Sequence, residues 1–418
     1  MTRPVPWLAL ALVLLAWPPA TAGAEPLTWD DGVREAAANN PDLAAAREAV
    51  RVAGLQHRIS YSTFYPQLSL DAEQSVTRHG NSEFSEGAGG NVGLSLRQSL
   101  FSGFRNRAAV RRASADVEFA EANLLAVKTE LSFDLKSAFT GILFSQEQLK
   151  LTGAIAERRK QNVRLVQLRY DAGREHQGSL LRSQASSQQA AFEVAQARRA
   201  LSVARRQLAR VLGRRDSADL MVTGDFAVTP PAGTPDFQAL VAQTPAHLQP
   251  AARVRAAEAG VTIATGQLYP EIAAVGSFSL KGDRPRDDAW STGVVLSMPL
   301  FAGGANIYNV QAAKAASRQS LENLKSANDQ VVLELEQTFA DFQDSLGNAT
   351  VQEEFVRTAN VRAEIGQNLY TNGLLSFEDW DLIENDLIAA QKNQIRSLRD
   401  LVVAEAAWEQ TQGKGAIP

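Results

Sequence analysis

The sequence of 418 residues contains no cysteine, and this absence excludes several kinds of chemistry. Disulfide bonds, thiolate metal sites, cysteine nucleophiles and an acylated N-terminal cysteine all require a thiol. Histidine is scarce too, and the four residues are scattered without the spacing of a metal site: His57, His79, His176 and His247. We therefore expect no metal, no cofactor and no lipid anchor on the mature chain.

Long hydrophobic runs and a strong charge of either sign are also missing. After residue 24 no segment approaches 18 consecutive apolar residues, which excludes further transmembrane helices. The net charge of −4 is small and mixed in sign, whereas nucleic-acid binding needs clustered basic residues. No nucleic-acid partner is expected.

The first 24 residues are typical of a cleaved secretory signal. Arg3 precedes the apolar run WLALALVLLAW, and the small residues Ala22-Gly23-Ala24 follow it. The run is too short to cross a bilayer as a helix, which takes about 20 residues. We expect export and a mature chain that starts at Glu25.

One stretch of the sequence occurs twice in altered form. LRQSLFSGFRNRAAV, residues 96–110, reappears 200 residues later as LSMPLFAGGANIYNV, residues 296–310. Further pairs have the same offset: Tyr170 and Tyr370, Gly173 and Gly373, Gly213 and Gly413. Two upstream pairs have an offset of 204: Asn40-Pro41 and Thr244-Pro245, Tyr65-Pro66 and Tyr269-Pro270. The chain is therefore interpreted as two copies of one unit.

Each copy contains a segment in which apolar and polar residues alternate, as in half-buried β-strands. The apolar positions of the first copy include Leu68, Leu70, Val92, Leu94 and Leu96, and those of the second include Phe278, Leu280, Trp290, Val294 and Leu296. The segments HGNSEFSEGAGGN and KGDRPRDD are polar and contain glycine or proline, which indicates exposed connecting loops. The sequence predicts one β-hairpin per copy, at about 66–101 and 270–301.

Directly after each Leu-Phe-x-Gly the period becomes helical, and apolar residues recur every seven positions. No proline interrupts either run, so we expect long helices at about 104–171 and 304–371, each roughly 100 Å long. Each ends at a glycine turn, and return helices follow at about 179–213 and 376–412. Another helix enters each hairpin, at about 42–64 and 246–268. Residues 25–213 and 245–418 form the two repeats, and the linker 214–244 is expected to pack around the middle of the long helices.

Strands of about ten residues with one apolar face are typical of transmembrane β-barrels, but soluble sandwiches alternate in the same way. Four strands cannot close a barrel, and an open sheet edge is not tolerated in hydrocarbon. A membrane location therefore requires several chains. Two chains would give about eight strands and a filled interior, whereas three would give about twelve and room for a channel. If passage is the purpose, three chains are favoured.

Taken together, these features resemble the TolC-like outer-membrane efflux family over essentially the whole mature chain. The resemblance rests on LTWDDGVREAAANNPDL near the N-terminus, the Tyr-Pro before each hairpin, the doubled Leu-Phe-x-Gly and the doubled Tyr-x-x-Gly. It implies an α+β membrane protein that forms a homotrimer. Twelve strands would make one barrel in outer-membrane lipid, and helices would continue it as a periplasmic tunnel. The implied function is a passive exit duct for efflux or type I secretion, with an adaptor and an inner-membrane pump docked at the helical tips.

The resemblance also implies where such a duct closes. In that family a ring of acidic residues near the second tip turn faces the lumen. Asp379 lies closest to the first acidic position of the family. At the second acidic position this chain has Leu382, so Asp381 is taken as the substitute. A solvated first helical turn explains the same acids equally well. At the tips, Arg169 or Arg174 is expected to pair with acids of the neighbouring tip, near Tyr170 and Tyr370, or to be an ordinary surface residue. Gly173 and Gly373 are expected to form the adaptor-docking turns.

Two charge runs inside the long helices, Glu353-Glu354 and Arg158-Arg159-Lys160, are interpreted as solvated faces without a role. The alternative function is a trimeric coiled-coil stalk or adhesin anchored by a barrel, which predicts an anchor at one end of the chain only. An enzyme needs a nucleophile, a base and an orienting group at recognisable spacing, and the sequence offers none. The transported substrate and the class of pump cannot be read from the sequence.

Overall fold

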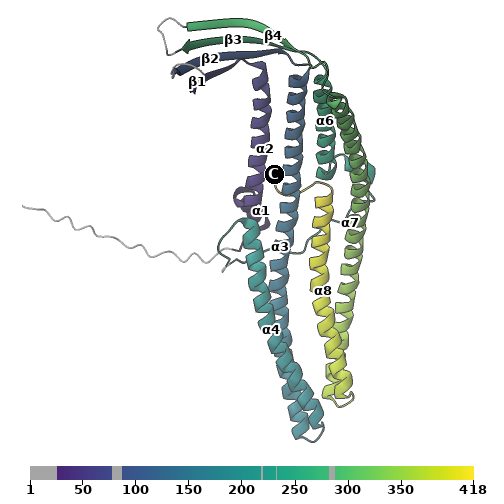
Figure 1. Ribbon diagram of the computed structural model, residues 1–418. Helices are drawn as coiled ribbons and strands as arrows, with labels where there is room; N and C mark the ends of the chain where they lie inside the picture. The colour runs from purple at the N-terminus through teal and green to yellow at the C-terminus, as the bar shows by residue number, and fades with distance from the viewer. Residues whose placement is uncertain (1–25, 78–86, 218–219, 232, 282–287) are drawn as a thin grey trace, which may run out of the picture.

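The computed structural model describes residues 26–77, 87–217, 220–231, 233–281 and 288–418. The expected signal sequence and much of both hairpin loops lie outside these ranges. A four-stranded sheet lies at one end of the molecule, and two long helices run from it to separate helical tips at the other end (Figure 1). No helix in the described ranges is long and apolar enough to cross a membrane.

The sheet is antiparallel throughout, in the order β1-β2-β3-β4, so the two hairpins join through β2 and β3. Its strands are β1 (Gln67–Thr77), β2 (Gly87–Phe101), β3 (Glu271–Lys281) and β4 (Asp288–Ser297). One row of paired residues crosses all four strands on the apolar face: Leu70, Leu94, Phe278 and Trp290. The adjacent row lies on the polar face and consists of serines: Ser69, Ser95, Ser277 and Ser291.

Two strand boundaries, the start of β2 and the end of β4, differ from the sequence prediction. Residues 87–91 were assigned to the first connecting loop, but they belong to β2, where Gly87 pairs with Thr77 and Asn91 with Lys281. Residues 87–90 pair with β1, and Asn91 pairs with β1 and β3, and this ladder outweighs the low strand propensity of glycine and asparagine. At the other boundary β4 ends at Ser297, short of the predicted 301. Pro299 lacks the N–H that a further ladder bond requires.

The two long helices are α3 (Arg105–Asp171) and α7 (Ala305–Thr371), each of 67 residues. At 1.5 Å per residue each is roughly 100 Å long. Each starts after two residues of positive φ, namely Gly103 and Phe104 before α3, and Gly303 and Gly304 before α7. A second helix then returns from each tip: α4 (Gln177–Leu212) and α8 (Phe377–Thr411).

The shorter helices α2 (Pro41–Ser60) and α6 (Pro245–Gly266) lie between the sheet and the return helices (Figure 1). Asn40 joins α2 to α4 end to end. Its side-chain oxygen accepts hydrogen bonds from the first turn of α2, while its amide donates to the Val211 carbonyl of α4 at 2.9 Å. Gly213 then ends α4 at φ 75°, against the backbone of Asn39. Thr244 and Gly413 form the corresponding joint between α6 and α8.

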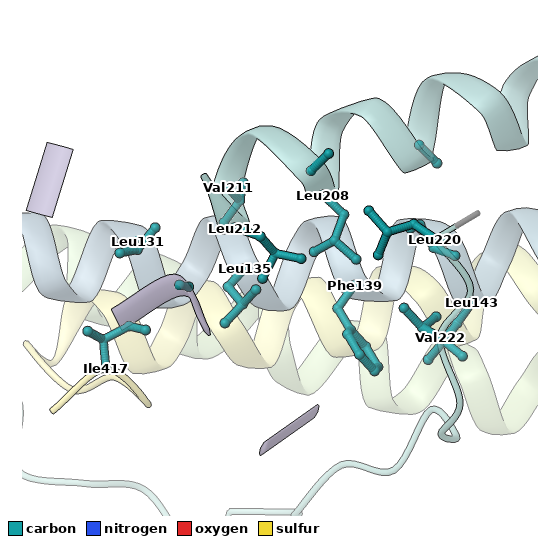
Figure 2. Packing of buried hydrophobic residues seen from close by; sticks show 14 of the residues in the cluster. Leu131, Leu135, Phe139, Leu143, Leu208, Val211, Leu212, Leu220, Val222 and Ile417 are labelled. Carbon is teal, nitrogen blue, oxygen red and sulfur yellow. The ribbon is translucent and has the colours of Figure 1, made fainter. Parts of the chain in front are cut away.

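The main hydrophobic core lies at this middle level, and Figure 2 shows how its side chains pack. Leucines of α4 pack against Leu135, Phe139 and Leu143 of α3, and Leu220 and Val222 of the linker cover them. A smaller core lies on α7, where Phe237 of the short helix α5 (Phe237–Val241) contacts Phe339 and Trp408. The helix α1 (Trp29–Asn39) completes this level, and η1 (Tyr61–Phe64) connects α2 to the sheet. Neither α1 nor α5 is among the helices predicted from the sequence.

Candidate functional site

The two tip turns have the same backbone geometry, although their sequences differ. After α3, the N–H of Gly173 donates to the Tyr170 carbonyl and that of Arg174 to the Arg169 carbonyl. After α7, Gly373 and Leu374 donate in the same way to Tyr370 and Leu369. This is the Schellman pattern, which places glycine in the left-handed conformation. Gly173 has φ 69° and Gly373 has φ 79°.

Each return helix begins with a side-chain cap. His176 accepts a hydrogen bond from the Ser179 N–H through Nδ1, and Ser376 accepts one from the Asp379 N–H. The Ser376 hydroxyl also donates to the Asp379 carboxylate at 2.7 Å. Asp379 therefore closes a reciprocal cap at an exposed helix start, where a negative charge also favours the helix dipole.

An aromatic cluster packs the α7–α8 tip against Arg169 of α3. The rings of Tyr370 and Trp380 stack at 4.3 Å, and Phe377 meets both edge-on. The Arg169 guanidinium lies 4.6 Å from the centre of the Tyr370 ring and donates to the Tyr370 carbonyl at 2.8 Å. The Tyr370 hydroxyl donates to Glu175 of the other tip turn at 3.1 Å. Burial raises the pKa of the Tyr370 phenol, and the charge of Glu175 raises it further.

A cluster of ion pairs, here named the tip ion-pair cluster, joins α8 to both helices of the first hairpin. Its members are Arg158, Arg159 and Asn162 of α3, Arg182 of α4, and Asp381, Glu384 and Asn385 of α8. Arg158 donates two hydrogen bonds to Glu384, at 2.7 and 2.8 Å. Asp381 accepts from Arg159 at 3.1 Å and from Arg182 at 2.9 Å. Glu384 is fully buried and Arg159 is 6% exposed.

Several of the tip residues singled out in the sequence have a different setting from the expected one. Asp381 is 5% exposed and paired within its own chain, so in this structure it is not available to a lumenal ring. Arg169 contacts carbonyls and an aromatic ring of its own chain rather than an acid. Tyr170 is exposed near the end of α3, and Arg174 is exposed in the turn.

The charge run Arg158-Arg159-Lys160 was interpreted as a solvated face, and that interpretation is wrong for Arg159, which is buried. Glu354, by contrast, is exposed and pairs only with Arg357 three residues along α7. Sequence periodicity could not separate the two cases, because the partners of Arg158 and Arg159 are more than 220 residues away. The sequence offered one signal for these ion pairs, namely Arg158 and Arg159 on one helix and two acids three residues apart, Asp381 and Glu384, on another.

The fold is that of solved outer-membrane channels. A structure of CusC matches 92% of this chain and 92% of its own, with a TM-score of 0.84 and 19% identity. The outer membrane protein VceC of Vibrio cholerae matches 92% of this chain and 96% of its own, with a TM-score of 0.79 and 21% identity. At these identities the likeness is one of fold.

The chain belongs to the outer membrane efflux protein family, whose model matches residues 32–214 and 237–414. Curated relatives include the fusaric acid resistance protein FusA of Burkholderia cepacia, 26% identical over 69% of this chain and 58% of its own length. The outer membrane efflux protein BepC of Brucella suis is 23% identical over 90% and 83% of the two chains. AprF of Pseudomonas aeruginosa, an alkaline protease secretion protein, is 25% identical over 98% and 87%. The family consists of channel proteins.

Proposed function

We propose that three copies of this protein form an outer-membrane channel with a periplasmic helical tunnel, which acts as the passive exit duct of a tripartite efflux or secretion system. The observation that carries this proposal is the sheet. Large apolar side chains of one face are exposed in the single chain: Leu70 is 70% exposed, Trp290 76% and Leu296 67%. The opposite face carries the serine row. Lipid on one side and water on the other match this distribution.

The sheet also explains why several chains are needed. In the described part of the chain β1 and β4 are the edge strands, and pairing β4 of one chain with β1 of the next would remove both edges. Three chains would give twelve strands, enough for a water-filled interior. The hairpins occur in both halves of the chain and share one sheet, whereas an anchored stalk predicts an anchor at one end. The duct is therefore the better-supported reading.

The tips are the proposed place of closure and docking. Arg169, Tyr370 and the tip ion-pair cluster hold the two helical hairpins of one chain together, and opening would separate them. Two buried nitrogens there, Arg169 Nε and Trp380 Nε1, have no hydrogen-bond partner among the described residues. Such groups cost about 1–3 kcal/mol each, which favours a tip that rearranges. We assign Gly173 and Gly373 to the turns that an adaptor contacts, and Asp379 to the tip opening.

The location follows from the same proposal. The protein is exported by a cleaved signal, inserts its sheet in the outer membrane without a lipid anchor, and extends its helices into the periplasm. The names of its relatives do not identify its substrate, because they refer to different substances. FusA is named for an acid, AprF for a protease and CusC for a cation. The inner-membrane pump would supply both the energy and the selection.

Membrane insertion is tested by two arginine substitutions at neighbouring positions of β2. Leu94→Arg places a charge on the apolar face, where it costs about 2–4 kcal/mol at mid-membrane depth, and should abolish outer-membrane trimers. Ser95→Arg is the matched control on the polar face and should insert normally. Fractionation of cells and electrophoresis of unheated samples measure both. Equal insertion of the two variants would contradict the assigned faces.

Conduction is tested by single-channel recording of the mature protein in a planar bilayer. The wild type should show a small conductance, and Glu384→Gln should increase it because Arg158 loses its buried partner. Glu354→Gln, which affects an exposed pair on α7, should behave like the wild type. If all three insert as trimers and none conducts, the duct is disproved and the anchored stalk is the better interpretation.

A further inference from the structure

A polar cavity of about 400 Å³ lies where the sheet joins the helices. Its lining comes from three strands and from α3 and α6, and includes Gln67, Arg97, Ser99, Arg105, Asn106 and Glu271. This cavity is at the opposite end of α3 from the tips. The proposed function uses none of its residues.

The cavity holds two guanidinium groups and one carboxylate. Arg97 of β2 donates to Glu271 at 3.0 Å, and Arg105 of α3 donates to the other oxygen of the same carboxylate at 2.6 Å. Arg105 also donates to the Ser102 carbonyl at 3.0 Å, whereas Arg97 has only its one bond to Glu271 among the described residues. The Arg97 side chain is 57% exposed. One positive charge is therefore in excess, and Arg97 retains free N–H donors.

The strand alternation places this cavity on the polar side of the sheet. Gln67, Arg97 and Glu271 are each an even number of residues from a serine of the serine row, so they share its face. Arg97 and Glu271 belong to β2 and β3, the middle strands, which edge pairing with another chain leaves uncovered. Asp71 lies on the same face, and its carboxylate lies 3.5 Å from the Ser95 hydroxyl, two residues along β2 from Arg97. Among the described residues Arg97 forms its ion pair with Glu271 and not with Asp71.

The fold itself does not require these charges. By the sequence offsets of 200 and 204, Arg97 corresponds to Ser297, Arg105 to Ala305 and Glu271 to Gln67. The second half starts its long helix α7 without an ion pair at these positions, although β4 ends at Ser297 where β2 continues to Phe101.

We propose that Arg97, held in place with Arg105 by Glu271, binds carboxylate or phosphate groups of solutes inside the duct. This inference rests on the proposed function only in making the polar face the lumenal one. Guanidinium presents a planar set of donors that matches both kinds of anion. Three copies would form an electropositive ring at the membrane end of the tunnel, and the preferred cargo would be acidic solutes.

Binding is tested by titration calorimetry of the detergent-extracted mature protein, with citrate and inorganic phosphate as separate probes. Arg97→Gln should weaken binding at least about fivefold, because a charge-assisted hydrogen bond is lost. Arg34→Gln removes one exposed positive charge from α1 and is the matched control, which should bind like the wild type. Binding of citrate alone assigns the site to carboxylates, and binding of phosphate alone to phosphates. The proposal is overturned if neither probe binds the wild type or if Arg97→Gln binds equally well.

Single-channel recording separates this inference from the proposed function. Citrate or phosphate added on the sheet side should reduce the wild-type current, and Arg97→Gln should relieve that block. If the wild type and Arg97→Gln both conduct and are blocked to the same extent, the anion site is overturned and the duct is unaffected. If inserted trimers do not conduct, the duct fails, and calorimetry alone decides whether the anion site exists.

Discussion

The guanidinium of Arg159 and the carboxylate of Asp381 lie 3.1 Å apart, both nearly inaccessible to water, and connect the first helical hairpin to the second. Removing one partner of a buried pair costs about 3–5 kcal/mol, because the other charge stays buried. Asp381→Asn should therefore loosen the tips and increase single-channel conductance. Protease sensitivity of the tip segments in the purified protein measures the same loosening.

Replacing both partners is the control for this prediction. The double variant Arg159→Met with Asp381→Leu buries no unpaired charge. Its tips should therefore be less protease-sensitive than those of Arg159→Met alone or Asp381→Leu alone. A double variant that is looser than both single variants would show that the ion pair, rather than its packing, holds the hairpins together.

The hydroxyl of Tyr370 connects the two tip turns through Glu175. Tyr370→Phe keeps the stack on Trp380 and removes only this hydrogen bond, at a cost of about 1–2 kcal/mol. Tyr370→Leu also removes the stack on Trp380 and the contact of the aromatic ring with the Arg169 guanidinium. We expect spontaneous channel openings to become more frequent in the order wild type, Phe, Leu, as counted in planar-bilayer recordings. Equal frequencies in all three would exclude the Tyr370 contacts from closure.

The raised pKa of Tyr370 gives a separate optical test. Its phenol should remain protonated above pH 10, the ordinary tyrosine value, because burial disfavours the phenolate. The contribution to stability is complete below pH 10 and is lost as pH rises through the folded-state pKa. The absorbance difference at 295 nm between the wild type and Tyr370→Phe should therefore titrate above pH 10. A difference that titrates at or below pH 10 would contradict the buried geometry.

Acid should weaken a second connection between the hairpins, from Lys392 of α8 to Glu193 of α4 at 2.6 Å. Burial alone would raise the pKa of Glu193, but hydrogen bonds from Lys392 and Gln189 bring it below 4.5. Its contribution to stability is present above pH 4.5 and is lost as pH falls through the lowered pKa. Glu193→Gln should reduce the melting temperature at pH 7 and have a smaller effect well below pH 4. An equal reduction at both values would exclude a charge effect.

The joint between α2 and α4 depends on a glycine that no side chain can replace. Gly213 has φ 75°, and an added Cβ would meet the backbone of Asn39. Gly213→Ala should lower the melting temperature measured by circular dichroism. Gly153, inside α3 with no atom near an added Cβ, is the matched control. Gly153→Ala should be neutral or stabilising by up to about 1 kcal/mol, because alanine favours a helix. The same loss at both positions would contradict the joint.

Much of the element order could be read from local patterns in the chain. The change from period two to period seven at Leu-Phe-x-Gly marked where strand gives way to long helix, and Gly173 and Gly373 marked the tips. These signals are strong because each depends on residues close in sequence. The start of β2 at Gly87 differs from the prediction, because pairing with Thr77 of β1 outweighs the low strand propensity of glycine.

The tip contacts could not be read in this way. Asp381, Asp379 and Glu378 look alike in the sequence, as acids near the start of one helix. Only the packing of α8 against α3 and α4 turns Asp381 inward to Arg159 and Arg182, while Asp379 stays at the exposed cap. The same packing buries Glu384, which the sequence analysis did not single out.

The sequence by itself therefore determined the repeated hairpins, the length of α3 and α7, the turns at their ends and the absence of thiol chemistry. Each of these follows from periodicity, backbone conformation or composition. The tertiary structure decided which charges meet: Arg159 with Asp381, and Arg97 with Arg105 around Glu271. Those partners are distant in the sequence, and a charge is buried or solvated according to what packs against it.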